Sequence, residues 1–183
     1  MKEPEKESIL DNIKNGYPLG ITKTPHNLST KISNYAKNEK HIVKILKQFI
    51  KETKNGDIEP INYDPNYIIN VFCVPKKDAD TGKMTKLRVV RHGSFSTKSK
   101  KAINDFIDPE YTQMDKLPNL KDYVNLLIDK NFCSVRDLKD AFRQIKIRRD
   151  EADYMGYSIF GLKFRDRKQP YGIASAAANC QKF

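Results

Sequence analysis

The stretch from Ser134 to Ile147 has the sequence "SVRDLKDAFRQIKI" and carries the most informative local pattern in the chain. Asp137 directly follows a short segment typical of a β-strand, and a compact turn comes next. Phe142 lies five positions further on, and apolar residues then alternate with polar ones. Taken alone, such an aspartate commonly caps a turn or a helix, so the rest of the sequence has to decide its role.

The composition indicates one globular domain. The chain has 183 residues, of which 38% are hydrophobic and 31% are charged. No apolar run is long enough to cross a bilayer, and the first residues lack the apolar core of a secretory signal. Three widely spaced cysteines fit neither a disulfide framework nor a zinc site, and they favour a reducing compartment. We therefore expect an intracellular protein without a membrane partner, with nucleus and cytoplasm as alternatives and no oligomeric state specified.

Positive charge is concentrated in one part of the chain. The formal net charge is +11, and residues 76–101 contain nine Lys or Arg residues against two acids, a local charge of +7. One interpretation is a solubilising surface. The other is a surface that contacts phosphate groups.

The hydrophobic periodicity predicts an ordered sequence of elements. Residues 1–36 are polar with several turn signals, which indicates a loosely structured N-terminal arm. An amphipathic helix is predicted over 39–54, ended by Asn55-Gly56, and strands over 67–75 and 87–90 form a hairpin with a basic tip. A second helix is predicted within 117–132.

Two further elements complete the expected order. A second antiparallel hairpin is predicted around Phe160-Gly161, and an Ala-rich helix follows near the end of the chain. With the strand before Asp137, the order is helix, hairpin, helix, strand, hairpin, helix. This order predicts an α+β fold with a mostly antiparallel sheet.

Several of these segments resemble a known family. "DLKDAFRQIKI" (137–147) resembles motif A of reverse transcriptases, "QPYGIASAAANCQKF" (169–183) resembles motif B, and "VFCVPKKDADTGKMTKLRVVRHGS" (71–94) resembles the fingers hairpin. The closest likeness is to tyrosine-recombinase retrotransposons of the DIRS-like group. There, "LRVVRHGSFSTKSKKAINDFID" is similar to a segment ending in Ser-Val-Asn-Asp-Gly-Ile, and residues 32–60 resemble an upstream helix. The resemblance covers roughly residues 28–183.

The resemblance implies a fold and an activity. Residues 37–183 would form the fingers and partial palm of a right-hand polymerase, preceded by the polar arm of residues 1–36. The family synthesises DNA from dNTPs on an RNA or DNA template–primer, using two Mg²⁺ ions, or Mn²⁺, held about 3.5–4 Å apart. By resemblance, Asp137 is the catalytic carboxylate and metal ligand of motif A, and carboxylates suit Mg²⁺.

The resemblance also assigns binding residues. Nucleotide contacts would come from Arg88 at the triphosphate, the backbone near Leu138, Phe142 as a steric gate under the sugar, and the Tyr171-Gly172 turn near the nascent base pair. An ordinary core aromatic remains the alternative for Phe142. The residues expected to contact nucleic acid are Lys76, Lys77, Lys83, Lys86, Ala174 and Ser175.

The chain also departs from the family pattern. Arg136 stands where the family usually has an apolar residue, and Ala177 and Cys180 replace the usual Pro and large apolar residue of motif B. Motif C, the thumb and the RNase H region are absent, so the resemblance implies a fragment that is inactive alone. The alternative is a non-catalytic nucleic-acid-binding module, or an inert fragment derived from a mobile element.

Overall fold

The structure, a computed structural model, describes residues 3–22, 38–98, 101–116, 119–128, 130, 132, 134 and 137–182. The helices are α1 (Glu3–Asn15), α2 (Glu39–Lys54), α3 (Leu120–Leu127) and α4 (Ala174–Lys182). The strands are β1 (Ile58–Ile61), β2 (Asn70–Lys77), β3 (Met84–His92), β4 (Gly156–Ile159) and β5 (Leu162–Asp166). Short 3-10 helices are η1 (Ile103–Phe106), η2 (Pro109–Thr112), η3 (Ala141–Gln144) and η4 (Ala152–Tyr154). The predicted α+β class with antiparallel pairing is confirmed.

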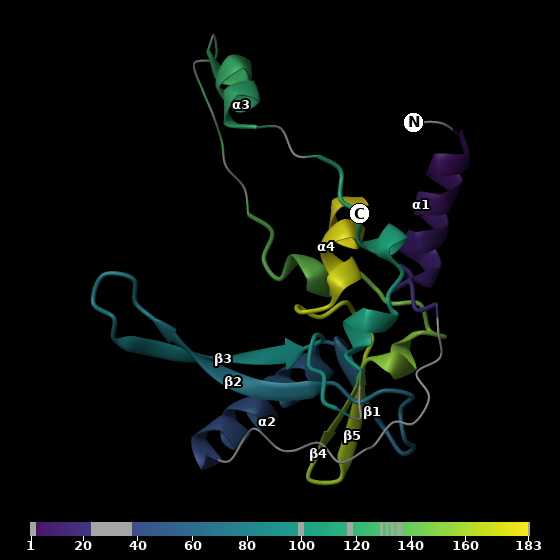
Figure 1. Cartoon of the computed structure of the whole chain (residues 1–183), viewed down its shortest axis with the longest axis vertical. Coiled ribbons are helices and arrows are strands. Elements are labelled where there is room, and N and C mark those ends of the chain that lie inside the picture. The colour runs from purple at the N-terminus through teal and green to yellow at the C-terminus, as the bar shows by residue number, and fades with distance from the viewer. Residues whose placement is uncertain are drawn as a thin grey trace.

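The strands form two sheets. β2 and β3 make a long antiparallel hairpin that projects from the body as an arm (Figure 1). The second sheet has the order β1-β5-β4, and its β4–β5 hairpin turns through Phe160 and Gly161, which have φ values of +50° and +80°. Two successive positive φ values are typical of a type I′ turn, which matches the natural twist of a hairpin. Both predicted hairpins are therefore confirmed.

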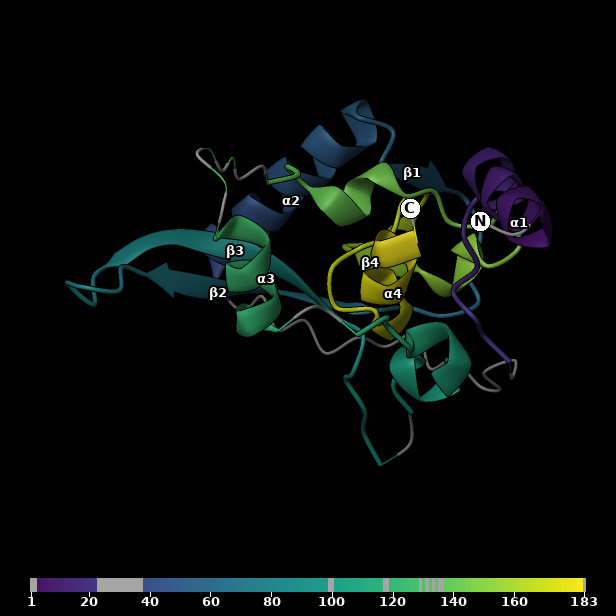
Figure 2. The same ribbon diagram turned by 90° about the horizontal axis from the view of Figure 1, so that it is seen from above.

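Helix α2 joins the two sheets. It begins after Asn38, whose side chain accepts a hydrogen bond from the Lys40 N–H, and it ends at Asn55-Gly56, as the sequence predicts. It contacts β1, β2 and β3, and Figure 2 shows it running beside the β2–β3 hairpin. Its buried face contributes to a core made of Leu19, Ile45, Phe49, Ile58, Tyr67, Ile69, Cys73, Ile103, Ile107, Ile147, Ala152, Met155, Tyr157, Ile173 and Ala176.

The N-terminal segment is folded onto the body. Residues 3–22 contain α1 and the buried residue Leu19, so the prediction of a loosely structured arm is wrong for them. The Glu151 carboxylate accepts hydrogen bonds from three consecutive backbone N–H groups, beginning with Leu19 at 2.6 Å. The Asn179 side chain of α4 donates to the Pro18 carbonyl at 2.8 Å. Residues 18–21 therefore pack against Glu151 and α4.

Helix α3 forms where the sequence predicts a helix, but it stands apart from the rest of the chain (Figure 1). Asn119 and Asp122 cap it reciprocally at 3.0 and 2.9 Å. The apolar side chains Tyr123, Val124 and Leu127 are exposed. Within the described ranges, no helix is long and apolar enough to span a membrane.

Candidate functional site

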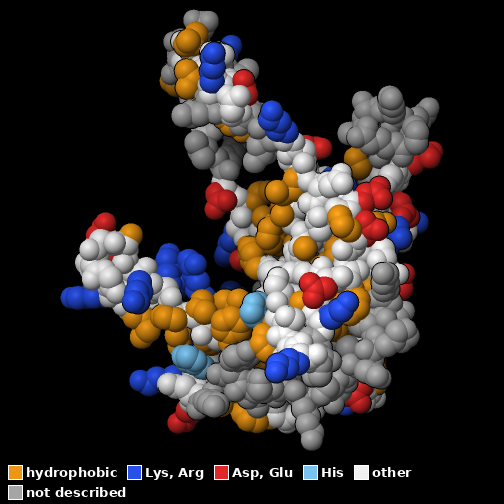
Figure 3. All heavy atoms as spheres, viewed as in Figure 1, with side chains coloured by type: hydrophobic (Ala, Val, Ile, Leu, Met, Phe, Trp, Pro, Cys, Tyr) orange, Lys and Arg blue, Asp and Glu red, His pale blue; other side chains and the backbone are white. Residues whose placement is uncertain are grey.

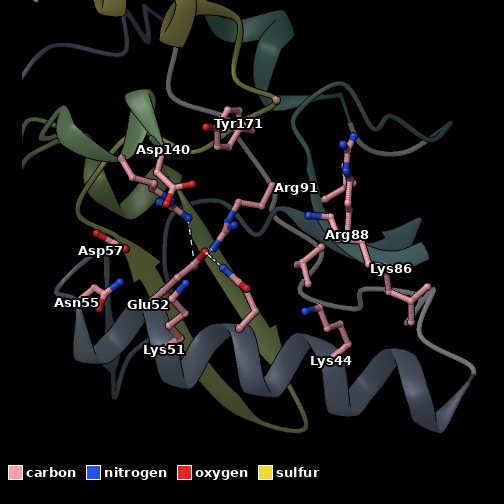
Figure 4. Close-up of a pocket in the computed structure, with 16 residues that line it drawn as sticks. Lys44, Lys51, Glu52, Asn55, Asp57, Lys86, Arg88, Arg91, Asp140 and Tyr171 are labelled. Atoms are coloured by element: carbon pink, nitrogen blue, oxygen red, sulfur yellow. Dashed lines mark hydrogen bonds and ion pairs between the residues drawn. The ribbon is translucent and has the colours of Figure 1, made fainter. Parts of the chain in front are cut away.

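A cavity of about 690 Å³ lies between α2, β3 and the loops that carry Asp140 and Tyr171 (Figure 4). Six of its lining residues are basic and three are acidic, so the lining carries a net positive charge. The lining residues are Lys44, Gln48, Lys51, Glu52, Asn55, Asp57, Lys86, Leu87, Arg88, Val89, Val90, Arg91, Asp140, Arg143, Tyr171 and Gly172. Four of the residues assigned by resemblance therefore border one space: Lys86, Arg88, Tyr171 and Gly172.

The β2–β3 arm carries an unpaired basic surface that leads to this cavity. Its exposed cations are Lys76, Lys77, Lys83, Lys86 and Arg88, and within the described chain none of them forms an ion pair. Lys76 lies directly opposite Lys86 across the hairpin. Like charges facing each other across two strands destabilise a hairpin, so this arrangement favours an anionic partner. Figure 3 shows basic side chains gathered along the arm.

The loop that begins at Asp137 differs from its prediction. Residues 132, 134 and 137 are irregular in the structure, so the predicted strand is not seen at these positions; Arg136 lies outside the described residues. Asp137 and Leu138 are exposed. Asp140 adopts a left-handed conformation with φ of +51°, and η3 follows it. This turn brings an aspartate that the sequence analysis did not single out to the cavity wall.

Phe142 and Tyr171 connect this loop to the next one. Their ring centroids lie 4.8 Å apart. The pKa of the Tyr171 hydroxyl lies above its ordinary value because of partial burial and the negative charge of Asp140; Arg143 acts against this shift, and Asp137 adds to it. Asp137 and Asp140 therefore both act electrostatically on the Tyr171 hydroxyl, although they lie 34 and 31 residues before it in the sequence.

Asn104 fixes the turn that carries Tyr171. Its side-chain nitrogen donates to the Gly172 carbonyl at 3.1 Å, and its side-chain oxygen accepts from the Ala174 N–H at 3.0 Å. Gly172 has φ of +95°, and a Cβ atom there would lie 2.3 Å from the Arg91 carbonyl oxygen. Sequence reasoning missed Asn104 as a site residue, although the Asn-Asp pair in the segment similar to Ser-Val-Asn-Asp-Gly-Ile pointed to it.

The start of α4 is less accessible than expected. Ser175 is fully buried, and its hydroxyl has no hydrogen-bond partner among the described residues. Ala174 is partly buried and packs against the core. The structure therefore places Ser175 inside the protein, away from any surface on which nucleic acid could lie.

A buried ion cluster forms the floor of the cavity. One Glu52 carboxylate oxygen accepts hydrogen bonds from Arg91 and, at 3.2 Å, from Arg143. Arg143 also donates to Asp166 at 2.5 Å. Arg91 donates to the Tyr157 hydroxyl at 2.8 Å, and that hydroxyl donates to Asp166. Two arginines and two carboxylates balance in charge, and their four side chains are at most 7% exposed.

The two carboxylates of the cluster respond differently to their surroundings. Burial alone would raise the pKa of Glu52, but the charges of Arg91 and Arg143 reverse this and hold the pKa below its ordinary value of 4.5. Asp166 is fully buried, and burial raises its pKa although the same two arginines oppose the shift. Glu52 is therefore the firmly ionised member on which both arginines depend.

The expected pair of metal ions requires more converging ligands than the described side chains offer. The described part of the chain has no group of three or more His, Cys, Asp or Glu residues able to hold a metal ion. Two metals about 3.5–4 Å apart require several converging ligands, and Asp137 and Asp140 offer two carboxylates on one loop. The described residues do not by themselves fit the pair, and bound Mg²⁺ or Mn²⁺ stays a prediction from the resemblance.

No protein-family model matches the chain, and no curated protein matches it. The geometry of the site must therefore support the function.

Proposed function

We propose that this chain is a reverse-transcriptase-like unit, comparable to the fingers and part of the palm of a right-hand polymerase, that binds a template–primer and a nucleotide. The observation that carries the proposal is the convergence of three segments that the resemblance selected separately. Residues 86–88, the loop 137–142 and the turn 171–172 meet at or beside one cavity. The loop reaches the cavity through Asp140 and through the contact of Phe142 with Tyr171, and this convergence supports a shared site.

The chemistry of the cavity suits phosphate groups. Arg88 and Lys86 are exposed cations without acidic partners in the part of the chain that the structure describes, and a planar guanidinium can bind phosphate oxygens through two hydrogen bonds. The Phe142–Tyr171 pair supplies an aromatic surface at the edge of the same space. Phosphate contacts on the arm and an aromatic contact beside them are the combination found where proteins bind nucleic-acid strands.

Salt-dependent binding tests the proposal. We expect the triple variant Lys83→Glu, Lys86→Glu, Arg88→Glu to reduce the slope of log K against log salt for a template–primer by about two to three, since each phosphate contact contributes about one. The matched control reverses three exposed lysines elsewhere, Lys6, Lys14 and Lys121, and both variants lower the net charge by six, from +11 to +5. Equal slopes in the two variants would refute the proposal.

Nucleotide selection distinguishes a polymerase-like site from a plain binding module. The next complementary dNTP should stabilise the complex with template–primer more than a mismatched dNTP does, and Arg88→Ala should remove that difference. A chain that binds the duplex with a steep salt slope but ignores the identity of the dNTP would be a non-catalytic nucleic-acid-binding module.

A further inference from the structure

Helix α2 carries a row of lysines that no sequence motif assigned to a site. Successive lysines of this row are four or three residues apart in turn. At about 100° per residue, they fall within an arc of about 80° around the helix axis. At about 1.5 Å per residue, the row extends over about 21 Å. We name it the lysine stripe, and its members are Lys40, Lys44, Lys47, Lys51 and Lys54.

The stripe is held toward solvent by the opposite face of the helix. Ile45, Phe49 and Glu52 are buried in the core and the ion cluster, so the helix cannot rotate to bury its lysines. Lys44 is partly exposed, and the other four lysines are exposed. The orientation is therefore fixed by packing.

The stripe has no acidic counterpart. Within the described chain, none of its ammonium groups forms an ion pair or a hydrogen bond. The only other acid of α2 besides the buried Glu52 is Glu39 at its first turn. The preceding residues 23–37 contain three lysines and no acid in their sequence. Like charges three and four residues apart destabilise a helix, whereas a merely solvated face usually mixes both signs.

The stripe continues the basic surface of the arm. Lys44 and Lys51 line the cavity from α2, while Lys86 and Arg88 line it from β3. Figure 4 shows Lys44 and Lys51 projecting from the helix toward the space that β3 borders. A polyanion lying along the arm can therefore cross the cavity and remain in contact with cations on α2.

We propose that the lysine stripe binds the sugar–phosphate backbone of a nucleic-acid strand that extends beyond the cavity. The identity of this anion rests on the proposed function. At about 3.4 Å per nucleotide along the axis, a row of about 21 Å spans about six nucleotides. Lysine ammonium groups contact phosphate as point charges without a fixed hydrogen-bond geometry, so the binding is independent of base sequence. An anionic membrane is the poorer partner because Ile45 and Phe49 of α2 are packed in the core, which leaves only Val43 and Ile50 as exposed large apolar side chains to insert into lipid.

The test uses stripe residues that do not line the cavity. The variant Lys40→Gln, Lys47→Gln, Lys54→Gln removes three charges and keeps residues of good helix propensity. For a single-stranded oligonucleotide of about 20 nucleotides, the slope of log K against log salt should fall by about two, because each phosphate contact on a single strand contributes about 0.7. The matched control changes Lys6, Lys14 and Lys121 to Gln, with folding of all proteins checked by circular dichroism and urea unfolding.

The outcomes separate this inference from the proposed function. A stripe variant indistinguishable from its control overturns the inference, while a reduced slope in the Lys83/Lys86/Arg88 variant would still uphold the proposed function. A reduced slope in the stripe variant together with an unchanged slope in the Lys83/Lys86/Arg88 variant upholds the stripe as a nucleic-acid contact and rejects the arm as one. Stripe-dependent binding of phosphatidylserine vesicles, without binding of the oligonucleotide, overturns the inference in favour of a membrane surface.

Discussion

Replacing Glu52 by Gln should be among the most damaging single changes to the fold. The Glu52 carboxylate is 6% exposed and bonds to both Arg91 and Arg143, so the substitution keeps the shape but leaves two arginines with one carboxylate. The cluster then carries one uncompensated positive charge in the interior. Breaking a buried ion pair from one side typically costs about 3–5 kcal/mol, a large part of the roughly 5–15 kcal/mol that stabilises a typical protein.

Urea unfolding measures this loss. With a typical m-value of about 2 kcal/mol per M, the midpoint should fall by about 1.5–2.5 M. The matched control is Asp64→Asn, which removes the carboxylate partner of Lys163 at a site where the Asp64 side chain is 65% exposed. An exposed pair contributes at most about 1 kcal/mol. If Glu52→Gln cost no more than the control, the cluster would not stabilise the fold as argued.

The pH dependence gives a second readout with a defined sign. The folded-state pKa of Glu52 is below 4.5, so its contribution to stability is present above that pH and is lost as pH falls through the folded pKa. The raised pKa of Asp166 acts in the opposite sense over the acid range. The difference in unfolding free energy between wild type and Glu52→Gln should therefore shrink below pH 4.5. A difference that stays constant down to acid unfolding would contradict this assignment.

Two further predictions concern single positions. Gly172→Ala should lower the free energy of unfolding in urea by more than about 2 kcal/mol, because the residue has φ of +95° and its new Cβ would meet the Arg91 carbonyl at 2.3 Å. The control Gly56→Ala places its Cβ in open space and should cost about 1 kcal/mol. Equal losses would contradict the close approach at Gly172. Tyr67 donates to the Lys101 carbonyl at 2.7 Å, and burial raises its pKa to about 12. Wild type should therefore lose stability between pH 10 and 12 by more than Tyr67→Phe does, and parallel pH curves would count against it.

Elements with a local periodicity were predictable from the sequence. The face of α2 that carries Ile45 and Phe49, and the Asn55-Gly56 end, are encoded within one stretch of chain. Both hairpins follow from alternating residues and turn chemistry. β1 was missed because it has only four residues and contains Pro60, which breaks the usual strand signal. α1 was missed because its mean hydropathy is low, and the burial of Leu19 after it depends on distant parts of the chain such as Glu151.

The ion cluster was not predictable from the sequence. Arg91 was counted within the basic segment 76–101, yet it is buried and paired. Its partner Glu52 is 39 residues away, and Glu52 is 91 residues from Arg143. A charge in a sequence window gives no sign of burial when its partner lies on another element. For the same reason the sequence did not predict that Lys44 and Lys51 line the cavity, because their position there depends on how α2 packs against β3.

The packing of the N-terminal segment against α4 has a consequence for biosynthesis. Pro18 and Asn179, which are joined by a hydrogen bond, lie 161 residues apart. At typical synthesis rates of about 5–20 residues per second, roughly 8 to 32 s pass between the synthesis of the first residue and that of the second. Glu151, which accepts from the Leu19 N–H, is made only 132 residues after Leu19, and α4 comes later still. This apolar segment therefore lacks its final partners on the folded body until α4 has been made.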